Sequence, residues 1–159
     1  VLGSDGTPVR NATIEIWQAD TNGRYGHPAE PGGPAVDRSF PSFSRRKTEA
    51  NGRFSFLTVK PGAYQAQGIL SGNKPYMRAP AIHFDITAKY ERRITHMSFR
   101  ENQPALFQGD LTFRKDLGIG INPNRDPMTA PAFSKLGGDA PGLEPGAELC
   151  SRDIVLRKG

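Results

Sequence analysis

The sequence predicts an all-β fold, an antiparallel β-sandwich with long loops. Three observations favour this fold class. Apolar and polar residues alternate in several short stretches, Gly, Pro and Asn residues punctuate the chain between them, and almost no stretch shows the 3.6-residue period of a helix. The 159 residues match the usual size of one domain, so we expect a single domain over residues 1–159.

The first predicted strand covers residues 9–18. It follows a turn at Asp5-Gly6, and Ile14 and Ile16 share its buried face because side chains two residues apart lie on the same side of a strand. Residues 20–43 are rich in Gly, Asn and Pro, and we expect them to form a long loop.

The next predicted element is a strand over residues 53–59, with Phe54 and Phe56 on one face. It follows Asn51-Gly52, a pair that supplies the positive φ angles of a tight turn. The Lys-Pro-Gly run after residue 59 ends this strand.

Three further strands are predicted, over residues 81–87, 93–99 and 153–156. The first of them alternates clearly. One face carries Ile82, Phe84 and Ile86, and the other carries Ala81, His83 and Asp85. Residues 108–146 are rich in Gly and Pro and show no sustained helical period.

Composition and charge exclude several classes of protein. The net charge is +5, but the basic residues are scattered and no aromatic pattern suits base stacking, so we expect no nucleic-acid partner. No window approaches the roughly 18 apolar residues of a membrane helix, so we expect no membrane partner. A single cysteine, Cys150, excludes an internal disulfide and a cysteine-based zinc site, so any metal here must recruit oxygen ligands besides the three histidines.

The chain starts at Val1-Leu2 without an initiator Met, and we expect it to be part of a longer protein. No signal peptide is visible at this start. We favour a cytoplasmic location over a secreted one.

Several motifs go beyond what a generic sandwich needs. In chain order they are IEIWQAD (14–20), NGRYGHP (22–28), FSRRKT (43–48), KPGAY (60–64), RAPAIHF (78–84) and ITHMSF (94–99). In this order the set resembles the intradiol ring-cleavage dioxygenases, the family of the catechol and protocatechuate dioxygenases. The resemblance covers residues 1–99 and the closing strand at 153–156, and it is loose over 101–150.

The resemblance implies a mononuclear, non-haem Fe(III) cofactor bound by two tyrosines and two histidines. The matching residues are Tyr25, Tyr64 and His83, and Tyr64 is the tyrosine that substrate displaces. Phenolates are hard anionic ligands that favour Fe(III) over Fe(II), and a displaced tyrosine can accept a proton. The family's first histidine is missing, because its position is Ala81.

Ala81 leaves three interpretations open. Water or another residue fills the gap and iron still binds, or the chain is a noncatalytic paralogue, or the alanine is an engineered substitution. Positions 81 and 83 share a strand face about 6.6 Å apart, so both would face the metal. If Ala81 is the only defect, Ala81→His is expected to raise iron occupancy and turnover.

Two residues are implied on the substrate side of the site. Arg78 matches an arginine that stabilises negative charge on the activated ring, and a guanidinium stays protonated at any working pH. His96 stands where the family has a glutamine beside the substrate, and it could contact substrate or reach the iron. His27 is interpreted as a solvated loop histidine, and Trp17 as a core residue.

The implied function is cleavage of a catechol-type aromatic by O2 between its two hydroxylated carbons, giving a muconate-type dicarboxylic acid. The alternative is an iron-free, noncatalytic paralogue or subunit that supports an active dioxygenase. A carbohydrate or cell-surface binding module would leave the motifs unexplained. The basic charge fits an anionic catechol such as protocatechuate, and the resemblance allows an oligomer.

Overall fold

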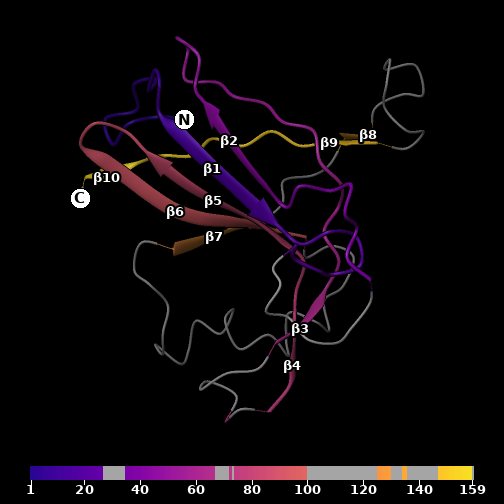
Figure 1. The fold of residues 1–159 in the computed structure, drawn as a ribbon. Coiled ribbons are helices and arrows are strands. Elements are labelled where there is room, and N and C mark those ends of the chain that lie inside the picture. Colours follow the sequence, from indigo (N-terminus) through magenta and orange to yellow (C-terminus); the bar gives the residue numbers. More distant parts are fainter. Residues whose placement is uncertain are drawn as a thin grey trace.

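The computed structural model describes residues 1–26, 35–66, 72, 74–99, 125–129, 134–135 and 147–158 (Figure 1). These residues form strands, turns and extended segments, as the predicted all-β class requires. Among them there is no helix long and apolar enough to cross a membrane.

The strands form one larger sheet and two small ribbons. In chain order they are β1 (Thr13–Gln18), β2 (Phe43–Lys47), β3 (Tyr64–Ala66), β4 (Tyr76–Arg78), β5 (Ala81–Thr87), β6 (Glu91–Ser98), β7 (Arg125–Thr129), β8 (Ser134–Lys135), β9 (Glu148–Leu149) and β10 (Arg157–Lys158). The larger sheet has the order β10-β6-β5-β1-β2, with β7 beside β6. Its pairs are antiparallel except β6 with β7.

The core lies on one face of the larger sheet. Alternation in β1 and β5 places Ile14, Ile16 and Phe84 on this face. Phe54 and Phe56 cover them, and each packs edge to face with Phe84, at 6.4 and 5.9 Å between ring centroids. The remaining buried members of this core include Val1, Ile82, Ile86, Ile154 and Leu156. The core-facing residues predicted for β1 and β5 are therefore confirmed.

Two predicted strands differ from the structure. Residues 53–59 keep the alternating exposure of a strand, but they form no ladder with the described residues. The predicted strand at 153–156 is reduced to an isolated bridge between Leu2 and Val155, and β10 follows at Arg157. Both segments cover the core through their side chains without joining the larger sheet over their length.

Local conformation explains two other boundaries. β1 begins at Thr13 because Asn11 has a positive φ of 57°, which interrupts an extended strand. The turn predicted at 51–52 is present, with positive φ at Gly52 only, and the side-chain oxygen of Asn51 accepts a hydrogen bond from the Arg53 amide at 2.9 Å.

Cys150 is expected to react slowly with a disulfide reagent in the folded protein. Its sulfur lies 3.3 Å from the sulfur of Met97, and burial raises the pKa of the thiol. Because the thiolate is the reactive form, labelling by dithionitrobenzoate at pH 8 should be at least about tenfold slower than in the chain unfolded by guanidinium. The rate should climb as the pH rises. Equal rates in the folded and unfolded chain would show that the Cys150 thiol is accessible to the reagent in the folded protein.

Candidate metal and substrate site

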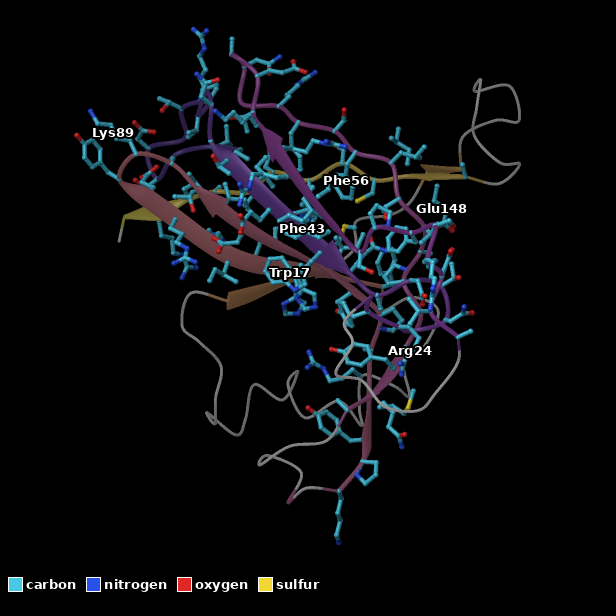
Figure 2. The ribbon with its side chains drawn as sticks, in the orientation of Figure 1. Trp17, Arg24, Phe43, Phe56, Lys89 and Glu148 are labelled. Atoms are coloured by element: carbon cyan, nitrogen blue, oxygen red, sulfur yellow. The ribbon has the colours of Figure 1, made fainter. Side chains whose placement is uncertain are left out.

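Three aromatic side chains form a row across the face of the sheet that points away from the core. Trp17 on β1, His83 on β5 and His96 on β6 are direct cross-strand partners. The rings of Trp17 and His83 stack at 5.3 Å with an interplanar angle of 13°, and those of His83 and His96 lie 5.7 Å apart at 46°. Figure 2 shows Trp17 and Phe56 on opposite sides of the sheet.

Two phenols meet in a second group. The rings of Tyr25 and Tyr64 contact edge to face at 5.4 Å between centroids. Tyr64 on β3 lies opposite Arg78 on β4, and the Arg78 guanidinium carbon is 5.7 Å from the centroid of the Tyr64 ring. A cation at this distance is attracted to the face of the ring. The β3–β4 ribbon therefore brings Arg78 and both tyrosines together.

The chain path joins the two groups. β4 ends at Arg78, and only Ala79 and Pro80 separate it from β5. The β3–β4 ribbon lies beyond the end of the larger sheet at which β1 ends and β5 begins (Figure 1). At the same end, Arg24 precedes Tyr25 close to this ribbon (Figure 2). The phenols and imidazoles therefore occupy adjoining parts of the fold.

Asp20 organises the loop that carries Tyr25. Its side chain is 1% exposed, and its carboxyl oxygens accept hydrogen bonds from the backbone amides of Asn22, Arg24 and Asp37 at 2.8–2.9 Å. Its backbone carbonyl accepts a further bond from the amide of Gly62 at 2.8 Å. One residue thus links the Tyr25 loop to residue 37 and to the segment that leads into β3.

Gly23 lets this loop approach the start of β3. Its φ is +77°, and a Cβ at this position would overlap the carbonyl oxygen of Ala63 and lie 3.2 Å from the Cβ of Tyr64. Gly62 lies at the same crossing of the two segments, and a Cβ there would overlap the carbonyl oxygen of Thr21. Two glycines are needed where these backbones cross.

Gln18 fixes the end of β1. Its buried side-chain amide donates to the carbonyl of Val59 at 2.8 Å, and its oxygen accepts from the hydroxyl of Thr58 at 2.9 Å. These bonds tie β1 to the segment before β3. Gln18 and Asp20 lie within the IEIWQAD motif, which was singled out in the sequence without a role for either side chain.

Several interpretations of single residues can now be compared with the structure. Trp17 was predicted to be a core residue, and this is wrong, because it lies half-buried on the outer face against His83. Asp85 shares that face and is held by Arg92, with nitrogen–oxygen distances of 3.0 and 2.6 Å. His27 lies outside the described residues. Ala81 is buried at the start of β5, two residues before His83.

The donor types suit a hard metal ion only if the phenols take part. Among the described residues no three His, Cys, Asp or Glu side chains gather as they would around a metal. Tyrosine oxygens beside histidine nitrogens form a mixed oxygen and nitrogen donor set, which suits iron. The contact between the two phenols and the contact between the two imidazoles therefore fit the ferric ion that the sequence predicts.

Comparisons with known proteins show the family to which this chain belongs. A sequence model of the family described as "Dioxygenase" matches residues 1–115. The protocatechuate 3,4-dioxygenase beta chain of Burkholderia cepacia is 41% identical over 102 residues, which are 62% of this chain and 41% of that protein. Catechol 1,2-dioxygenase 2 of Acinetobacter lwoffii is 32% identical over 129 residues, 75% of this chain and 44% of that protein. The class is thus a dioxygenase, and the chain belongs to the intradiol ring-cleavage dioxygenase family.

Solved structures agree on the fold. Catechol 1,2-dioxygenase from Acinetobacter sp. ADP1 superposes with a TM-score of 0.71 at 21% identity, and the match covers 99% of this chain and 50% of that one. The chain spans less than half the length of the two curated relatives above.

Proposed function

We propose that this chain forms the iron site of an intradiol dioxygenase that cleaves a catechol-type aromatic with O2 to a muconate-type dicarboxylic acid. The observation that carries the proposal is the contact of Tyr25 with Tyr64 beside Arg78, on the ribbon that leads directly into the strand of His83. Membership of the family supports it. An anionic catechol such as protocatechuate suits the positive charge of Arg78.

Tyr25, Tyr64 and His83 would hold the ferric ion. When bound, Fe(III) draws electron density from a coordinated catechol and makes its ring reactive toward O2. Two phenolate oxygens would partly neutralise the ion, which favours the ferric over the ferrous state.

The protein's own groups bind the substrate and manage its protons. The Tyr64 phenolate would take a proton from a catechol hydroxyl, so the substrate would bind as an anion. Arg78 lies over the Tyr64 ring and would stabilise the negative charge that develops on the substrate, since a guanidinium stays protonated. His96 lies beside His83, on the side of the sheet that the substrate would approach.

Elemental analysis and a visible spectrum of the purified protein test this function. We expect about one iron per chain and a red-brown tyrosinate-to-Fe(III) band that shifts when catechol is added. Tyr25→Phe and Tyr64→Phe should each weaken the band, because each removes one phenolate donor. Tyr90→Phe is the matched control, since Tyr90 is exposed in the turn between β5 and β6.

The alternative is a noncatalytic subunit, and Ala81 is the observation that favours it, because a methyl side chain offers no donor. A protein that stays colourless and iron-free after reconstitution, and that associates stably with an active dioxygenase chain, would establish the alternative and refute the proposed function.

A further inference from the structure

We propose that His96 is a metal ligand, so that the imidazoles of His83 and His96, from two neighbouring strands, bind one metal ion together. This inference rests on the proposed function for the identity of that ion as iron. It assigns to β6 the imidazole that position 81 of β5 does not supply, and of the two roles left open for His96 it selects metal binding over substrate contact.

Strand geometry places His96 close enough for this role. Residues directly opposite in an antiparallel pair have Cα atoms about 4.5–5.5 Å apart, whereas positions i and i+2 of one strand are about 6.6 Å apart. His96 is the direct partner of His83 across β5 and β6. Its backbone is therefore nearer to His83 than the backbone of Ala81 is.

The two rings need little movement to share an ion. Two imidazoles bound through nitrogens at about 2.0–2.1 Å from one metal have ring centres roughly 5 Å apart. The rings of His83 and His96 are 5.7 Å apart and tilted by 46°. A small rotation of the side chains would close this difference. The Nε2 atom of His96 is buried, so a metal bound there would be shielded from bulk water.

The side chains around His83 favour His96 as its partner in binding the metal. β5 lies between β1 and β6, so Trp17 stacks on His83 from one side and His96 contacts it from the other. Asp85 and Thr87 also carry oxygen atoms on this face of β5, but both carboxyl oxygens of Asp85 accept hydrogen bonds from Arg92, and Thr87 lies two positions further along the strand. The imidazole of His96, directly opposite His83 on β6, is therefore well placed to bind the same metal ion.

Counting histidine nitrogens on a bound metal tests the pair directly. The full chain, labelled with 15N-histidine, would be loaded separately with Fe(III) and with Cu(II) as a probe, and examined by pulsed electron paramagnetic resonance. We expect couplings from two histidines in the unaltered protein and from one in His96→Gln. Trp17 is the single tryptophan of the chain, and its stacking on His83 makes its fluorescence a second readout, quenched on metal binding.

Moving the imidazole distinguishes a ligand from a residue that acts on the site indirectly. The double variant Ala81→His with His96→Gln should regain the second histidine coupling, and its metal affinity should recover at least about tenfold over His96→Gln alone. Asp85→Asn is the matched control on the same strand face, and its couplings should equal those of the unaltered protein. The count in the unaltered protein needs no variant to fold.

The outcomes separate this inference from the proposed function. Iron binding with a tyrosinate band, but with one histidine coupling that His96→Gln leaves unchanged, would overturn the role of His96 and keep the function. Two couplings with Cu(II), reduced to one in His96→Gln, in a protein that takes up no Fe(III), would support the pair and overturn the function.

Discussion

Asp20→Ala is expected to lower the free energy of unfolding by about 3–5 kcal/mol. The substitution leaves the amides of Asn22, Arg24 and Asp37 without the carboxyl oxygens to which they donate. A buried amide that loses its acceptor costs about 1–3 kcal/mol, and these three bonds are part-buried around a side chain that is 1% exposed, so water replaces them only in part. Chemical denaturation followed by circular dichroism measures the change.

Asp37→Ala is the matched control for this prediction. Asp37 lies in the same region and also accepts two hydrogen bonds, from the amide and hydroxyl of Ser39, but it is exposed. Its replacement keeps the backbone amide that donates to Asp20, so a much smaller change is expected. Asp20→Asn should fall between the two, because an amide retains one acceptor oxygen. Similar losses in Asp20→Ala and Asp37→Ala would contradict the central role of Asp20.

The alternating strands were predictable because the alternation of apolar and polar residues matches the alternation of buried and exposed side chains. Ile14 and Ile16 in β1, and Ile82, Phe84 and Ile86 in β5, stand at every second position and face the core. β2 was not predicted, because its residues, FSRRK, show no alternation of apolar and polar side chains. They pair with β1 at the sheet edge, where both faces are largely exposed, and Arg45 forms an ion pair with Glu15 across that edge.

The site was predictable in its members and not in its contacts. Motif order indicated Tyr25, Tyr64 and Arg78, and the structure brings these three together. The pairing of His83 with His96 depends on the register of β5 and β6, which their tight turn sets through the bond from the Ala88 amide to the Glu91 carbonyl. Counting outward from that turn could have shown that the two histidines face each other.

The roles of Asp20 and Gly23 depend on tertiary contacts that carry no periodic pattern. A single Asp or Gly in a loop is compatible with many turns, and only the approach of residues 62–64 shows why these two are needed. Both residues act on the same junction, where the Tyr25 loop meets the start of β3. Substitutions there should therefore change stability and the site together.

Gly23→Ala is expected to cost about 2–4 kcal/mol of stability and to separate Tyr25 from Tyr64. The left-handed conformation alone costs an alanine roughly 1–2 kcal/mol. The added Cβ would also overlap the carbonyl oxygen of Ala63, which is backbone and can yield only if the two segments move apart. Thermal unfolding measures the first effect. The tyrosinate-to-Fe(III) band at equal protein concentration measures the second.

Gly6→Ala separates the effect of the left-handed backbone conformation from the effect of the close contact at Ala63. Gly6 has a similar φ of +82°, but a Cβ there meets nothing within 4 Å. It should therefore show only the conformational cost and keep the full band. If both variants lose the same stability and retain the same band, the contact at Ala63 does not hold the tyrosines together. If Gly23→Ala alone loses the band, the site depends on the close approach of Gly23 to Ala63 as well as on the side chains that bind the metal.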